Sequence, residues 1–155
     1  METVGVGLYF EDLPLGKQYR SIGRTITETD VINFISSIGM YGLPFTNAQY
    51  MADESDIRGK VVPGLLVVCY AEGLLVQSTM KKTGHAFLNM QWDIHAPVFV
   101  GETIHVDCEV TEHRPSKSRP DRGMVRSLNK IYKQDGTHVQ TYTPLRWIKR
   151  REAGS

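Results

Sequence analysis

Few side chains in this sequence are placed to exchange protons with a substrate. Asp53 and Glu54 begin a short acidic cluster, and a carboxylate is a common general base. Tyr41 could donate a hydrogen bond in a dry pocket, although a phenol has a reference pKa of about 10. His95 lies on an alternating segment and could face a pocket. For each of them, a packed or solvated structural role is the competing interpretation.

Metal and thiol chemistry are not indicated. The histidines show no paired spacing typical of metal ligands; they are His85, His95, His105, His113 and His138. Cys69 and Cys108 lie in apolar or alternating stretches and are interpreted as buried, reduced thiols. We therefore expect neither a metal site nor a cofactor.

A first helix and an unusual loop should position any site in the first half of the chain. Thr27, with Asp30 three positions later, resembles a capping box. The apolar residues that follow keep helical spacing until Gly39, which is placed to end the helix. Residues 39–47 contain two glycines and a proline among apolar side chains, which favours a structured loop over a helix.

A buried helix and a sheet are expected in the rest of the chain. Pro63 and Gly64 open a run at residues 65–75 that is apolar on nearly every side, as in a buried helix. Residues 104–111 alternate between apolar and polar, and a turn at residues 134–136 separates two further strand patterns. These patterns predict an α+β fold in which an antiparallel sheet wraps around a central helix.

Composition limits the classes of partner. The chain has 155 residues and a formal net charge of +1, which suits one domain over residues 1–155 with its core at about residues 9–148. A balanced charge gives no reason to expect nucleic acid. The longest apolar run is too short to span a bilayer, and no secretion signal is recognisable, so we expect a cytoplasmic protein that does not enter membranes.

Several segments, in their order and spacing, carry a resemblance to a known family. They are Tyr9-Phe10-Glu11-Asp12 with Gly16, residues 23–30 (GRTITETD), residues 59–66 (GKVVPGLL), Pro97-Val98 with Gly101-Glu102-Thr103, and residues 114–123 (RPSKSRPDRG). Over about residues 9–148, the chain resembles the MaoC-like dehydratases, which include (R)-specific enoyl-CoA hydratases. The resemblance implies a hot-dog fold, and pairing of two such units as a homodimer or a hot-dog heteromer.

The resemblance also identifies a departure from the family. MaoC-like dehydratases carry an Asp, followed five positions later by a His, and these two residues hold the reacting water. An ungapped alignment through Gly39 places Met40 at the Asp position and Phe45 at the His position. A thioether and a phenyl ring cannot exchange protons at neutral pH, so the catalytic residues are unknown and the candidates are the four residues considered first.

The binding half of the family's site is better preserved. In the resemblance, Gly64 matches the glycine whose N–H, at the start of the central helix, binds the thioester carbonyl. A helix N-terminus suits developing negative charge. Leu65, Tyr41 and Asn47 are predicted to complete the substrate-binding site. An ordinary helix start is the structural alternative for Pro63 and Gly64.

Three functions compete on this sequence. The leading one is a hydro-lyase of the hydratase or dehydratase type that acts on, or binds, an α,β-unsaturated acyl thioester or a related conjugated substrate. The second is a non-catalytic hot-dog subunit that pairs with an active partner. The third is a hot-dog thioesterase, which needs a carboxylate near the central helix, and the cluster at Asp53 and Glu54 is the obvious source.

Overall fold

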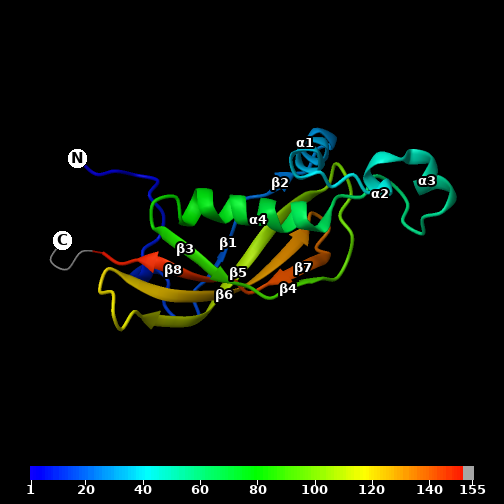
Figure 1. Ribbon diagram of the computed structural model, residues 1–155. Helices are drawn as coiled ribbons and strands as arrows, with labels where there is room; N and C mark the ends of the chain where they lie inside the picture. Colours follow the sequence, from blue (N-terminus) through cyan, green and yellow to red (C-terminus); the bar gives the residue numbers. More distant parts are fainter. Residues whose placement is uncertain (152–155) are drawn as a thin grey trace.

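The structure, a computed structural model, describes residues 1–151 and contains a single sheet with its longest helix over one face (Figure 1). The helical elements are η1 (Phe10–Asp12), α1 (Glu28–Ile38), α2 (Leu43–Thr46), α3 (Ala48–Asp53) and α4 (Gly64–Thr79). The strands are β1 (Gln18–Arg20), β2 (Arg24–Thr25), β3 (Gly84–Asn89), β4 (Trp92–Ile94), β5 (Thr103–Pro115), β6 (Arg122–Lys133), β7 (His138–Tyr142) and β8 (Leu145–Lys149).

The sheet is antiparallel throughout, and α4 crosses one of its faces (Figure 1). Its strands follow the order β1-β5-β6-β7-β4, with β8 also pairing β6 and β3 pairing β8. β7 and β8 are therefore two halves of one bent strand, and β4 and β3 form the outer edge beside it. The α+β hot-dog arrangement expected from the sequence is confirmed.

The alternating pattern on β5 directs its apolar side chains toward α4. Ile104, Val106, Cys108 and Val110 are at most 3% exposed, and they share a core with residues of α4. The polar residues between them lie on the opposite face, as period-2 alternation requires. The expected burial of Cys108 is confirmed, whereas Cys69 on α4 is exposed.

The capping box predicted for α1 is present. The Thr27 hydroxyl accepts a hydrogen bond from Asp30 N at 3.2 Å, and the Asp30 carboxylate accepts one from Thr27 N at 2.8 Å. Gly39 adopts a left-handed conformation, with φ of 72°, and ends the helix. Sequence and structure agree here because both signals are local.

Two expectations about the helices were wrong. Residues 39–47 were expected to be a loop, yet Leu43–Thr46 form α2, with Pro44 in the first turn, where a missing N–H costs no helical hydrogen bond. α4 is buried on one side only, because Leu65, Cys69 and Val76 remain exposed along its other side. The apolar side chains on that second side therefore do not pack in the core of this chain.

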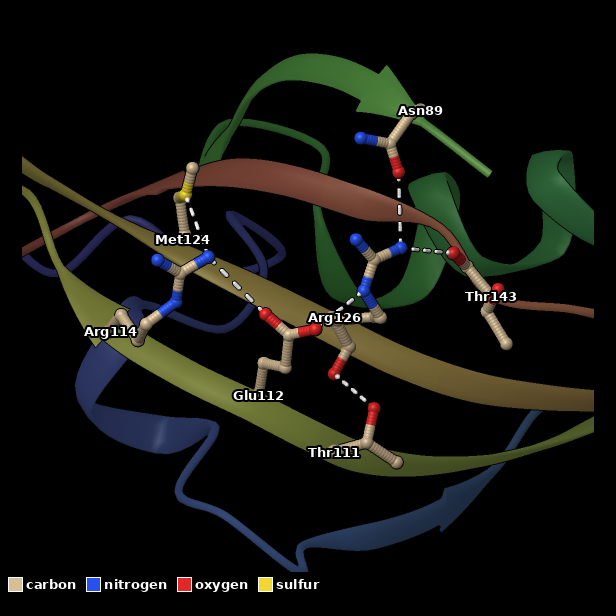
Figure 2. Close-up of polar contacts among 7 residues, drawn as sticks. All are labelled: Asn89, Thr111, Glu112, Arg114, Met124, Arg126 and Thr143. Atoms are coloured by element: carbon tan, nitrogen blue, oxygen red, sulfur yellow. Dashed lines mark hydrogen bonds and ion pairs between the residues drawn. The ribbon is translucent and has the colours of Figure 1, made fainter. Parts of the chain in front are cut away.

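Arg126 ties the sheet together where its outer strands bend (Figure 2). Its guanidinium donates to Glu112 Oε1 at 2.9 Å, to Thr143 O at 2.8 Å and to Asn89 Oδ1 at 3.1 Å. Asn89 ends β3, and Thr143 lies between β7 and β8. One side chain therefore bonds to both bends and to β5, which holds the outer strands against the sheet.

Candidate functional site

A cavity of about 570 Å³ lies between α1, the α2–α3 segment and residues 57–61. Its walls are mostly apolar and include Val31, Ile32, Pro44, Phe45, Ala48, Met51, Ala52, Ile57, Val61 and Val100. α2 and α3 extend beyond the sheet, next to the start of α4 (Figure 1). Ligand cavities of this size are typically apolar, with a few polar groups that orient the ligand.

The polar groups of the cavity include an ion pair that sequence reasoning missed. Glu28 Oε1 lies 2.8 Å from Lys60 Nζ, and both residues line the cavity together with Arg58. Glu28 is the only carboxylate among the lining residues that the structure describes. Its sequence position gives no sign of this role, because an acidic residue in the first turn of a helix is ordinary.

The two positions of the expected acid–base pair are apolar parts of this region. Phe45 lines the cavity, and Met40 and Phe45 are both partly buried against the core. Asn47 also lines the cavity, but its Oδ1 accepts a hydrogen bond from Tyr50 N at 2.9 Å and caps α3. Tyr41 is 62% exposed and is not among the lining residues. The structure therefore brings Phe45 and Asn47 to the cavity and leaves Tyr41 outside it.

The acidic cluster also lies outside the cavity lining. Asp53 and Glu54 are both exposed at the end of α3. The Asp53 carboxylate accepts a hydrogen bond from Gln49 Nε2 at 2.7 Å, within the same helix segment. Neither carboxylate is among the residues that line the cavity, so their placement lends no support to the expected role as a substitute base.

His95 belongs to a cluster with Thr141 and His138 of β7. Its Nε2 lies 2.8 Å from Thr141 Oγ1, and the same hydroxyl lies 2.8 Å from His138 Nε2. The two imidazole rings are 4.7 Å apart. Burial lowers the pKa of His138, and the nearby charge of His95 lowers it further. His95 is exposed and is not among the residues that line the cavity, so the structure does not join it to the other candidates.

The start of α4 follows the cavity-lining residue Val61 by three positions in the sequence, and neither Gly64 nor Leu65 is among the lining residues. Pro63 O accepts hydrogen bonds from Leu66 N at 3.0 Å and from Val67 N at 3.3 Å. The N–H groups of Gly64 and Leu65 donate to no group in residues 1–151. Such free amides at a helix start favour an oxygen that carries negative charge.

The helix start is packed closely against β4 and β7. A Cβ on Gly64 would lie 2.5 Å from Ile94 Cδ1, so a larger residue would require Ile94 to move. Gly64 O accepts a hydrogen bond from Gln140 Nε2 at 3.0 Å. Gln140 Oε1 in turn accepts one from Trp92 Nε1 at 2.9 Å. Neither Gln140 nor Trp92 was among the residues expected at the site.

α4 also carries a carboxylate that the sequence analysis did not consider. Glu72 accepts two hydrogen bonds from Arg146, at 2.6 and 2.7 Å, and one from the Tyr142 hydroxyl at 2.8 Å. Burial alone would lower the pKa of Arg146, but the hydrogen bonds and charge of Glu72 outweigh it and raise that pKa. Burial, followed by the charge of Glu72, raises the pKa of Tyr142. Glu72 is thus fully engaged as a structural partner.

With this geometry established, comparison with known proteins places the chain. The family model described as the FAS1-like, dehydratase domain region matches residues 15–142. The chain belongs to this family of dehydratase domains. The resemblance to MaoC-like dehydratases and (R)-hydratases is confirmed at the level of the family.

Individual relatives agree with this membership. A 3-hydroxybutyryl-CoA dehydratase from Methylorubrum extorquens is 26% identical over 115 residues, which cover 72% of this chain and 69% of the relative. A MaoC-like dehydratase structure from Rhodospirillum rubrum is 26% identical, with a TM-score of 0.79, and the match covers 94% of this chain and 99% of that one. A double hot-dog protein from Mycobacterium tuberculosis is 20% identical, with a TM-score of 0.82, over 99% of this chain and 47% of that one.

A helix that spans a bilayer must be both long and apolar. Across residues 1–151, none combines the length and the apolar character needed to cross a bilayer. α4 is the longest helix and has 16 residues. A span of the hydrocarbon core needs about 20 apolar residues in helical form.

Proposed function

We propose that this dehydratase-family domain binds an α,β-unsaturated acyl thioester, with the acyl group in the apolar cavity and the thioester carbonyl at Gly64 and Leu65. One observation carries this proposal: the apolar cavity wall at Val61 is followed, three positions later in the sequence, by two helix-start amides that donate to no group in residues 1–151. The acyl group needs apolar walls, and the carbonyl needs hydrogen-bond donors.

The same arrangement suits the chemistry of adding or removing water. When water adds to the β-carbon of an enoyl thioester, negative charge develops on the carbonyl oxygen before the α-carbon is protonated. Two aligned N–H groups at a helix start stabilise that charge more than they stabilise the ground state. Gly64 and Leu65 therefore supply the oxyanion part of the reaction.

The proton carrier is the part of the site that departs from the family. Because Met40 and Phe45 cannot exchange protons, any turnover depends on another group. Glu28 is the carboxylate that lines the cavity, and carboxylates are common general bases. We infer that Glu28 is a better candidate for the proton carrier than Tyr41, Asp53, Glu54 or His95.

A second hot-dog unit is the proposed partner. The exposed side of α4 is apolar at Leu65, Cys69 and Val76. The outer edge of the sheet is exposed at Phe87 and Leu88, and in residues 1–151 β3 pairs only with β8. An open strand edge and an exposed apolar helix face both suit a partner that continues the sheet.

A non-catalytic subunit is the second candidate function. The observation that favours it is the apolar lining at Phe45 in place of an acid–base group. In this role the chain would complete the pocket of a hot-dog partner that keeps the Asp and His of the family. Co-purification with such a partner supports this role, whereas a homodimer with turnover of its own contradicts it. A thioesterase would need a free carboxylate near α4, and Glu72 is held by three hydrogen bonds.

The deciding experiment is turnover of a panel of trans-enoyl-CoA substrates by the purified full chain. Loss of the conjugated enoyl absorption reports hydration, and calorimetry on the same samples reports binding. Turnover supports a hydro-lyase, and binding without turnover supports the subunit role. Release of free thiol without hydration would instead identify a thioesterase. A chain that neither binds nor converts any member of the panel would overturn the acyl-thioester proposal.

A further inference from the structure

We propose that Gln140 is a positioning residue, which orients the Gly64–Leu65 peptide at the start of α4 through a hydrogen-bond relay that begins at Trp92. The relay runs from Trp92 Nε1 to Gln140 Oε1 at 2.9 Å, and from Gln140 Nε2 to Gly64 O at 3.0 Å. Its consequence for ligand binding rests on the proposed function above, whereas its effect on the peptide itself does not.

The chemistry of the two partners determines the orientation of the amide. An indole N–H can only donate, and a backbone carbonyl can only accept. Gln140 must therefore turn its oxygen toward Trp92 and its nitrogen toward Gly64. Gln140 is 1% exposed, so bulk water cannot replace either partner.

The relay needs a side chain that accepts at one end and donates at the other, and the neutral amide of Gln140 does both. An ionised glutamate at residue 140 would accept from Trp92 but would place a second acceptor against Gly64 O. A methionine at residue 140 would fill the space but would leave the indole N–H without a partner and remove the side-chain hydrogen bond to Gly64 O.

The relay acts on the peptide group that carries one of the two free amides. Gly64 C=O and Leu65 N–H belong to the same planar peptide unit. A hydrogen bond to the carbonyl fixes the direction of that plane and polarises the unit, which makes Leu65 N–H a stronger donor. Pro63 caps the helix without a side-chain hydrogen bond, so Gln140 supplies a side-chain contact at the helix start.

The relay also connects the helix start to the outer strands. Trp92 and Ile94 lie on β4, and Gln140 lies on β7. Ile94 Cδ1 would be 2.5 Å from a Cβ on Gly64, so the same strand that starts the relay also limits the space at the helix start. Together these contacts set the position of the two amides relative to the sheet.

The test compares Gln140→Met, Gln140→Glu and Trp92→Phe with the wild-type full chain. Gln77→Glu on α4 is the matched control, because Gln77 is exposed and has no side-chain hydrogen bond in residues 1–151. Amide NMR of Leu65 without ligand reports the peptide directly. Binding of a trans-enoyl-CoA is followed by calorimetry, and the red shift of its bound enoyl absorption reports polarisation of the carbonyl.

We expect both Gln140 variants to shift the Leu65 amide resonance, to weaken enoyl-CoA binding by about tenfold and to reduce the red shift. Trp92→Phe keeps the amide at residue 140, and we expect a smaller change of the same kind. It also provides the test if a Gln140 variant does not fold. Gln77→Glu should leave the Leu65 resonance, the affinity and the red shift unchanged.

Two results would overturn the inference: an unchanged Leu65 resonance in folded relay variants, or a shifted resonance with unchanged binding and red shift. Failure of the wild-type chain to bind any enoyl-CoA would instead overturn the proposed function. In that case the Leu65 resonance in the variants still decides whether Gln140 orients the peptide. The two failures are therefore distinguishable.

Discussion

Glu28 and Lys60 meet at the cavity with 2.8 Å between carboxylate and ammonium, although 32 positions separate them in the chain. Their side chains are 54% and 68% exposed, so solvent screens the pair and its contribution to folding is small. The pair therefore places a carboxylate at the cavity while contributing little to the free energy of folding. A group that adds little to folding but lines an apolar cavity is a candidate for chemistry.

Glu28→Gln tests this interpretation. If the chain hydrates enoyl-CoA with Glu28 as the base, turnover should fall by about 100-fold or more, because the amide cannot accept the proton. Binding should persist, and the free energy of unfolding should change by less than about 0.5 kcal/mol. Steady-state kinetics and urea denaturation give these values, with Asp53→Asn as the matched control. Equal turnover in the two variants would exclude Glu28.

Gly64→Ala tests the close packing at the start of α4. The added methyl group would displace Ile94, and overpacking of this kind costs about 1 kcal/mol of unfolding free energy. Shortening Ile94 to alanine in the same chain should recover part of that loss. Gly73→Ala is the control, since a Cβ there meets nothing within 4 Å. We expect that control to gain roughly 0.5–1 kcal/mol from helix propensity, and a loss would contradict the packing described.

Among the polar contacts of the core, the ion pair between Glu72 and Arg146 should contribute most to the free energy of unfolding. Arg146 is 8% exposed, so Glu72→Gln leaves a buried guanidinium without its counter-charge. We expect a loss of about 3–5 kcal/mol in chemical denaturation. The double variant Glu72→Met with Arg146→Met should be more stable than Glu72→Gln. If the single change costs no more than a surface pair, the bidentate geometry is incorrect.

His138 should make the protein less stable in mild acid. Its pKa lies below the ordinary value of 6.5, so the unfolded chain binds the proton more tightly than the folded one. Stability should therefore fall as the pH is lowered through 6.5 and level off below the pKa of the folded state. Urea denaturation between about pH 7.5 and pH 5 measures this slope. His138→Gln should flatten the curve, and His85→Gln on β3 should not.

Arg126 should stabilise the bends of the outer strands through the contacts drawn in Figure 2. Arg126→Met removes three hydrogen bonds from a side chain that is 23% exposed, and we expect a cost of about 2 kcal/mol. Faster hydrogen exchange should appear in β3 and β8. Arg114→Met removes the more exposed partner of Glu112 and should change stability by less than about 0.5 kcal/mol. Similar effects of the two changes would show that Arg126 has no special role at the bends.

Features encoded by neighbouring residues were predictable from the sequence. Thr27 and Asp30 form the capping box of α1, and the alternation from Ile104 to Val110 places that stretch of β5 on the core. Both depend on the geometry of a single element, which sequence spacing reports directly. Pro44 shows the limit of such reasoning, because a proline that usually indicates a loop also suits the first turn of a helix.

The sequence by itself determined the α+β class, with an antiparallel sheet around a central helix, and the helix start at Gly64. Both follow from residue types and short spacings, which do not change when the chain folds. The resemblance to a known family implied the hot-dog arrangement, and its placement of Met40 and Phe45 at the acid–base positions stays a prediction. Only the tertiary structure decided that Glu28 meets Lys60 at the cavity and that Gln140 bonds to Gly64. Such contacts join residues far apart in the chain, and their geometry is set by packing of the sheet against α4, which no local pattern encodes.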